Sequence, residues 1–268
     1  MNEIGFSNEF LDLLLRHAAL KERVANEVEM YMHFVNNVGP NIKARYMMLV
    51  GCLECTVRRL EVDVNRWKRR FALRQQYLNR GDKPDMVAIE AQLDMEFAKY
   101  VSEIAAYVKE LEESKLRWDA EKMSDKEAAA IRYDYLKAVK RLHPDINENL
   151  SESAKSLWNQ IQQAYAANDW RQLKFLVGLV DDVVSGNAAV AASDGGLEEM
   201  RAACARLEAE AGDVAKNIAD LKSKKPFTYE DLIDDSEALA QRQAWLNGRI
   251  KELESAIARY ERIWNNGQ

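Results

Sequence analysis

One short segment of the sequence places side chains that can bind a charged partner close together. It contains the tripeptide His143-Pro144-Asp145, which follows a basic stretch and is followed by Asn147. Pro144 cannot continue the hydrogen-bond ladder of a helix, and it pushes the residue before it out of helical geometry. We therefore expect a helix that ends near Leu142, then a tight loop, then a second helix.

The helix before the tripeptide is predicted to have an apolar and a basic face. It opens with a capping box, in which Ser124 is the N-cap and Glu127 follows three residues later. Side chains at helical spacing form the apolar face: Ala128, Ile131, Tyr135, Val139 and Leu142. The basic residues fall on another face, which we expect to be exposed: Lys137, Lys140 and Arg141, with Arg132 about two turns from Lys140.

After the tripeptide, an apolar stripe of helical period predicts a helix that lies antiparallel against the first. Its members are Ala154, Leu157, Trp158, Ile161, Ala164 and Tyr165.

Two short antiparallel helices joined by His-Pro-Asp resemble the J-domain of the DnaJ co-chaperone family. Family members place a lysine-rich run led by tyrosine before the tripeptide, here residues 135–142, and a helix ending in Ala-Tyr after it, here 161–165. The segment 168–171 is similar to the loop and arginine that open the family's last helix. The resemblance covers about residues 124–180, one fifth of the chain.

The resemblance implies a co-chaperone that docks on a DnaK-type heat-shock ATPase and stimulates its ATP hydrolysis. In that role the basic face would steer the protein toward an acidic patch and contact its rim. Asp145 would accept charge-assisted hydrogen bonds from an arginine of the ATPase, His143 would donate a hydrogen bond, and Pro144 would fix the turn. The implied binding set is His143, Pro144, Asp145, Arg132, Lys137, Lys140, Arg141 and Asn147. No covalent chemistry is implied, so we expect an activator that is not itself an enzyme and that needs no cofactor or metal.

The sequence departs from the family pattern in two ways. The short first helix with its Tyr-x-x-Leu-Gly element is missing, and we expect the end of the preceding helix to take its place through Leu111, Leu116 or Trp118. No Gly/Phe-rich segment and no array of four CxxCxGxG motifs is present either. Any client or target would therefore have to be held by the coiled-coil regions.

Composition predicts the elements that position this segment. The 268 residues are 47% apolar and 31% charged with only 11 Gly and 4 Pro, which favours long helices over a β-sandwich, a doubly wound sheet or a disordered chain. No apolar run of about 18 residues exists, so we expect no membrane span. With no basic, apolar leader at residue 1 and only three cysteines, we expect a cytoplasmic protein.

We expect an all-α protein in four parts. Residues 1–123 would form a long three-helix bundle, broken at 38–40 and 80–84, and residues 124–184 the J-like domain. Residues 185–196 would be a linker, and 197–268 an antiparallel coiled-coil hairpin that bends at Lys225-Pro226. The longest heptad seam runs through Tyr46, Val50, Leu53, Val57, Leu60, Val64, Trp67 and Phe71.

Several alternatives remain at this stage. The basic stripe of Arg59, Arg66, Arg70 and Arg74 could bind nucleic acid or an acidic protein, but the net charge of −6 and the seam positions of the nearby aromatics favour pairing with neighbouring helices. Cys52 and Cys55 have CxxC spacing without a second ligand pair, which favours packing over metal or redox chemistry. The competing function is a coiled-coil scaffold with a degenerate J-like domain, and homo-oligomerisation is left open.

Overall fold

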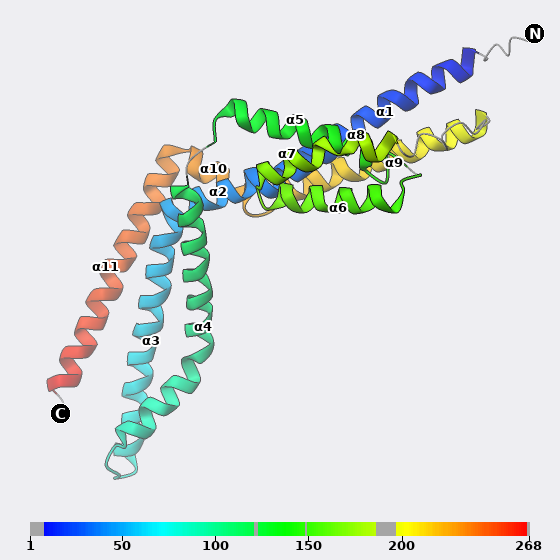
Figure 1. The fold of residues 1–268 in the computed structure, drawn as a ribbon. Helices are drawn as coiled ribbons and strands as arrows, with labels where there is room; N and C mark the ends of the chain where they lie inside the picture. Colours follow the sequence, from blue (N-terminus) through cyan, green and yellow to red (C-terminus); the bar gives the residue numbers. More distant parts are fainter. Residues whose placement is uncertain (1–7, 121–122, 148, 186–196, 267–268) are drawn as a thin grey trace, which may run out of the picture. The chain divides into compact units, whose positions relative to one another are not determined.

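The chain folds into helices that gather in two compact units. The structure is a computed structural model that describes residues 8–120, 123–147, 149–185 and 197–266. No strand occurs in these ranges, which confirms the all-α class. The first unit combines residues 1–40 with 121–227, and the second combines 41–120 with 228–268 (Figure 1). None of the described helices has the length and apolar character that a membrane span requires.

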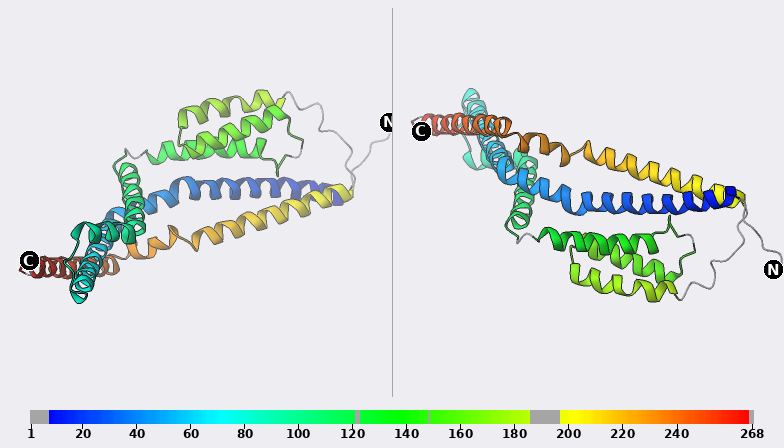
Figure 2. Two further views of the ribbon diagram at one scale, coloured as in Figure 1. Left: turned by 90° about the horizontal axis from the view of Figure 1, so that it is seen from below. Right: turned by 90° about the horizontal axis from the view of Figure 1, so that it is seen from above.

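The first unit pairs two long helices and sets four shorter ones beside them. Its elements are α1 (Asn8–His33), α5 (Asp125–Leu142), α6 (Glu152–Ala166), α7 (Trp170–Gly178), α8 (Val180–Ser185) and α9 (Leu197–Lys222). Helix α1 continues into a π-helical stretch, Phe34–Val38. Figure 2 shows α1 beside α9, with α5 to α8 grouped along α1.

Helices α1 and α9 run parallel. Arg201 forms an ion pair with Glu9, and Arg16 forms one with Glu208 at 2.5 Å, so each pair joins residues 192 positions apart. Apolar residues of α1, α5, α6, α7, α8 and α9 form one continuous core. The seams of α1 and α9 therefore pack into the same core as the predicted helix-loop-helix.

The second unit is built around α3. Its elements are most of α2 (Gly39–Tyr46), a π-helical stretch Met47–Gly51, α3 (Cys52–Asn79), α4 (Met86–Asp119), α10 (Glu230–Asp234) and α11 (Ser236–Asn266). Helix α4 folds back antiparallel on α3 after a turn in which Gly81 has φ of 79°, a left-handed conformation that glycine adopts without strain. Helix α11 runs parallel to α3, because Arg242 pairs with Glu54 and Arg249 with Glu61, each across 188 positions.

A polar cluster joins four elements of the second unit. One Glu54 carboxylate oxygen accepts hydrogen bonds from the Tyr46 hydroxyl at 3.1 Å and from Arg242 at 2.6 Å, and the other accepts one from Tyr107 at 3.4 Å. Burial and the nearby carboxylate raise the pKa of both tyrosines. On α11, the Gln243 amide donates to the Leu49 carbonyl at 2.8 Å, inside the π-helical stretch. These bonds place α3, α4 and α11 in one arrangement.

Two predictions about domain organisation are wrong. The segment 197–268 does not form a hairpin, because α9 packs on α1 and α11 packs on α3 in a different unit. Residues 1–123 do not form one three-helix bundle, because α1 belongs to the first unit and α3 and α4 to the second. The physical reason is that a heptad seam defines an apolar face but accepts any partner with the same period.

The predicted break at 38–40 is also wrong, since helical hydrogen bonding continues through it. Pro40 has no N–H to donate to a carbonyl of the preceding turn. The π-helical stretch Phe34–Val38 lies directly before it, and its wider hydrogen-bond ring changes the pairing there without ending the helix. The predicted linker, apart from Ser185 at the end of α8, lies outside the described residues.

Candidate functional site: the His-Pro-Asp loop and its basic helix

Helix α5 begins at the predicted capping box. The backbone N–H of Ser124 donates to Glu127 Oε2 at 3.1 Å, and the N–H of Glu127 donates to Ser124 Oγ at 3.3 Å. Hydrogen bonds from Ser124 lower the pKa of the Glu127 carboxyl. The box satisfies two backbone donors that the first turn of a helix leaves unpaired.

Aromatic stacking holds α5 and α6 together. The ring of Tyr135, which is fully buried, stacks on Tyr165 with centroids 4.0 Å apart and lies 5.9 Å from Trp158. All six residues of the predicted stripe on α6 are buried, and so are Tyr135, Val139 and Leu142 on α5. The prediction that these two helices pack through their apolar stripes is confirmed.

The loop between them is held by bonds from both of its ends. The His143 ring packs edge-on against Trp158 at 5.4 Å, and its Nδ1 accepts a hydrogen bond from the Asp145 N–H at 3.3 Å. Burial lowers the pKa of His143, and the bond accepted at Nδ1 requires that the neutral ring carry its proton on Nε2. The Asn147 amide donates to the Lys140 carbonyl at 3.1 Å, which caps the end of α5. Asn147 therefore has a structural role.

The tip of the loop faces solvent. Pro144 and Asp145 are exposed, whereas Ile146 is buried in the core. Burial raises the pKa of the nearby Glu210 carboxyl on α9, and the charges of Asp145 and Asp213 raise it further. The tip is thus a site of negative potential that favours a cation, and Glu210 contributes to it although nothing in the sequence linked it to the loop.

The basic side chains are not a free, solvent-facing stripe, which corrects the prediction. Arg132 makes a bidentate ion pair with Glu29 of α1, with both N–O distances 2.7 Å. Lys140 pairs with Glu22 of the same helix at 2.5 Å. Lys137 and Arg141 both pair with Asp181 of α8, at 3.0 and 3.5 Å. Each of the four cations keeps 38 to 51% of its side chain exposed, so the face is neutralised but not covered.

A helix from the start of the chain lies against α5. Its ion pairs show that α1 runs antiparallel to α5, since Glu22 meets Lys140 and Glu29 meets Arg132. The residues predicted to take the place of the family's first helix do not lie there. Leu116 is 75% exposed, Trp118 is 43% exposed, and both belong with Leu111 to α4 of the second unit.

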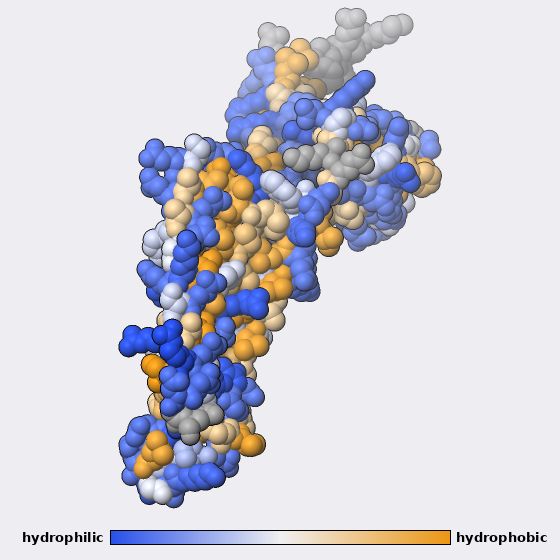
Figure 3. Space-filling view, turned by 90° about the vertical axis from the view of Figure 1, so that its left-hand side faces the viewer, coloured by the Kyte–Doolittle hydropathy of each residue, from blue (hydrophilic) through white to orange (hydrophobic). Residues whose placement is uncertain are grey.

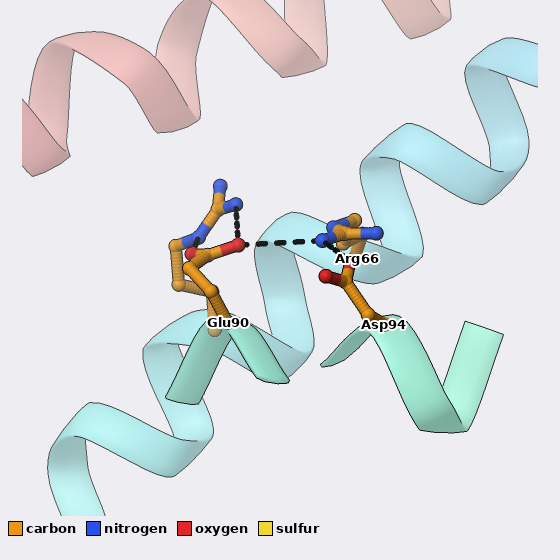
Figure 4. A network of polar contacts seen from close by, with 4 residues as sticks. Arg66, Glu90 and Asp94 are labelled. Carbon is orange, nitrogen blue, oxygen red and sulfur yellow. Dashed lines mark hydrogen bonds and ion pairs between the residues drawn. The ribbon is translucent and has the colours of Figure 1, made fainter. Parts of the chain in front are cut away.

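Two arginines of the second basic stripe are paired within the α3–α4 hairpin. The Glu90 carboxylate of α4 accepts two hydrogen bonds from Arg70, at 2.6 and 2.9 Å, and forms an ion pair with Arg66 at 3.3 Å. Arg66 also pairs with Asp94 (Figure 4). The Arg74 guanidinium lies over the Trp264 ring at 5.0 Å. Pairing with acidic residues of a neighbouring helix, the alternative favoured above, is confirmed for Arg66 and Arg70. Arg74 contacts an aromatic ring of α11, and Arg59 is exposed.

The cysteines and the acidic residues offer no metal site in the described part of the chain. Cys52 is exposed, Cys55 is buried, and no group of three or more potential metal ligands gathers among the residues that the structure places.

The groups at the loop region are suited to binding a charged partner. It presents an exposed carboxylate on a rigid tip, next to a helix whose cations are held by reversible ion pairs. Comparison with known proteins assigns the chain to no family. The sequence matches no protein-family model and no curated protein, and the fold matches no solved structure.

Proposed function

We propose that this protein is a J-domain-type co-chaperone that docks on a DnaK-type ATPase and stimulates its ATP hydrolysis. The observation that carries the proposal is the loop tip, where Pro144 and Asp145 are exposed while His143 packs against Trp158 and Ile146 is buried in the core. A carboxylate held on a rigid loop loses little entropy when it binds a guanidinium.

The packing around the loop is consistent with the J-like arrangement inferred from the sequence. Stacked aromatic rings hold the antiparallel helices α5 and α6 together, and the basic residues lie along α5, which leads into the loop. Helix α1 packs antiparallel along α5. In this proposal the protein acts as an activator in the cytoplasm, and the parallel helix pairs bind the client or target.

Single-turnover ATP hydrolysis by a purified DnaK-type ATPase tests the proposal. The wild-type chain should accelerate hydrolysis, and the Asp145→Asn variant should not, because the amide keeps the shape of the tip but loses the charge. Asp134→Asn provides a matched control, since it removes one carboxylate from α5 away from the loop. Equal hydrolysis rates with wild type, Asp145→Asn and no added protein would exclude the proposed function.

A scaffold or oligomerisation role is the second candidate, and a specific observation favours it. Helix α4 exposes large apolar side chains on the surface of the second unit, with Val87 at 81%, Met95 at 74% and Val101 at 53%. Figure 3 shows apolar side chains in a band among charged ones on one face of the molecule. Exposed apolar surface of this kind favours association.

Light scattering coupled to size-exclusion chromatography separates the two candidates. A scaffold should form oligomers that dissociate when Val87 and Met95 are changed to Ser, whereas a co-chaperone needs no oligomer for activity. A monomer at micromolar concentration that still stimulates ATP hydrolysis would reject the scaffold.

A further inference from the structure

The charge pairing between α1 and α5 has a regulatory consequence. We infer that α1 acts as an internal competitor for the basic face of α5, and that the ATPase must displace its carboxylates in order to dock. This inference rests on the proposed function, in which the same cations contact an acidic surface of the ATPase. The carboxylates of α1 already provide such a surface within the chain.

The two helices match in spacing as well as in charge. Glu22 and Glu29 lie two turns apart on α1, and Lys140 and Arg132 lie about two turns apart on α5. Because the helices are antiparallel, both carboxylates meet a cation, at 2.5 and 2.7 Å. Glu29 is only 5% exposed, and Arg132 bonds both of its carboxylate oxygens. An acidic partner surface would have to present carboxylates in a similar pattern.

Some buried polar groups near the contact between α1 and α5 have no hydrogen-bond partner among the described residues. The hydroxyl of Tyr135 and the Nδ1 of His33 are buried without a hydrogen-bond partner among the described residues. Both groups are close enough to the ion pair for its charges to change their pKa. Glu29 raises the pKa of Tyr135, while Arg132 lowers and Glu29 raises the pKa of His33. Buried polar atoms without partners destabilise the contact that encloses them. They favour an interface that can open.

Helix α1 has a second partner that would retain it. Its ion pairs to α9, Glu9 with Arg201 and Arg16 with Glu208, involve neither Glu22 nor Glu29. The Cys204 thiol also donates to the Leu13 carbonyl at 3.7 Å. Loss of the ion pairs with α5 therefore leaves the ion pairs of α1 with α9 in place.

The test measures the concentration of this protein that gives half-maximal stimulation of a DnaK-type ATPase in single-turnover hydrolysis. A Glu22→Gln/Glu29→Gln variant should lower that concentration by about fivefold or more, the lower end of typical coupling between sites. The matched control, Glu9→Gln/Glu208→Gln, removes the same charge from the pairing of α1 with α9 and should leave it unchanged. Glu22→Gln alone, at an exposed pair, should act in the same direction and guards against misfolding at Glu29.

The outcomes separate this inference from the function on which it rests. If wild type stimulates, Asp145→Asn does not, and both glutamine variants match wild type, the internal competition is rejected and the function stands. An equal gain from the control pair would also overturn it, because the effect would then be one of net charge. If neither wild type nor the Glu22→Gln/Glu29→Gln variant stimulates, both proposals fail. Stimulation by the variant alone would mean that the wild-type chain lacks the proposed function, so both proposals would fail for it as well.

Discussion

Helices α3 and α5 both carry a row of basic side chains, but their cations find partners at very different distances along the chain. Arg66 and Arg70 of α3 pair with residues of α4 that are 20 to 28 positions away, across one tight turn. Arg132 and Lys140 of α5 pair with α1, 103 and 118 positions away. The first pairing forms whenever the hairpin folds, whereas the second requires two separate segments to meet. A basic stripe therefore indicates a docking face only where its partners can leave.

The two units also differ in what stabilises them. The first unit buries a stack of aromatic rings and all three histidines of the chain lie in it. The second unit lines the contact between α3 and α4 with ion pairs, and a small apolar cluster of Leu73, Ile89, Leu93 and Phe97 lies between them. Its outer end is held by aromatic and cation–π contacts, such as Arg70 over Trp67 at 4.4 Å. We expect the units to respond differently to truncation, pH and salt.

The largest difference between the two units should come from truncating a buried side chain in one unit at a time. Tyr135→Ala removes a fully buried ring from the first unit and should lower its free energy of unfolding by about 3–5 kcal/mol. Leu93→Ala is the counterpart in the second unit and should cost about 2–5 kcal/mol there. Hydrogen exchange resolved by peptide measures both. Equal loss of protection in the two units after either change would show that they unfold as one.

Acidification should weaken the first unit before the second. Burial lowers the pKa of His17, His33 and His143 from 6.5, so the unfolded chain binds protons more readily and stability falls as the pH drops below about 6.5. In the second unit, ion pairs with arginines lower the pKa of Glu90 and Glu96 from 4.5, the latter to about 2. Their contribution persists until the pH falls below about 4.5.

Calorimetry at about pH 7 and about pH 5.5 checks this order. The Tyr135→Ala variant identifies which unfolding transition belongs to the first unit. On acidification that transition should move to lower temperature, while the transition of the second unit should stay in place. A change of His17 to Gln should reduce the shift. If the transition of the second unit moves first, burial of the histidines is not what limits stability in acid.

Neutralising one carboxylate of the second unit should have a smaller effect. Glu90→Gln removes the charge shared by Arg66 and Arg70 and should destabilise the hairpin by about 1 kcal/mol at low salt, with less loss at high salt. Glu103→Gln is the control, because its pair with Lys99 is exposed at 3.8 Å and should contribute almost nothing. Urea titrations at two salt concentrations measure both variants. An equal loss from the control would mean that net charge, and not the pairing with α3, is responsible.

The smallest differences should come from the helix caps. Ser124→Ala at α5 and Asp85→Ala at α4, where the carboxylate accepts from two backbone N–H groups, should each cost about 1 kcal/mol in the unit that contains the cap. Ser102→Ala, at an exposed position within α4, should be neutral or slightly stabilising. Urea midpoints compare the three. A loss at Ser102 as large as at the caps would contradict a capping role.

Local features were predictable from the sequence, and long-range partners were not. The capping box at Ser124, the stripe on α6 and the seam of α3 were all correctly inferred, because each depends on residues within one or two turns. The direction and the partners of α9 and α11 were missed. A parallel helix that lies about 190 positions along the chain leaves no local signal beyond the seam itself.

The candidate site divides in the same way. The exposure of Pro144 and Asp145 and the end of α5 follow from proline chemistry, which acts on neighbouring residues. The partners of the basic residues depend on where α1 and α8 lie, and charge alone does not identify which of 44 acidic side chains will face a given cation. Asn147 illustrates a third case, since its side chain reaches back to the helix end by a bond that the spacing permits but does not require.

The hydrogen bond from Gln243 to the Leu49 carbonyl bears on how the two helices could slide. Two heptad seams can slip past each other by seven residues and still match apolar side chains. Such a slip would move Gln243 about 10 Å from the π-helical stretch Met47–Gly51 and would break its bond to the Leu49 carbonyl. The Gln243 bond, together with the ion pairs of Arg242 and Arg249, thus favours one alignment of α11 on α3 over others of similar apolar fit.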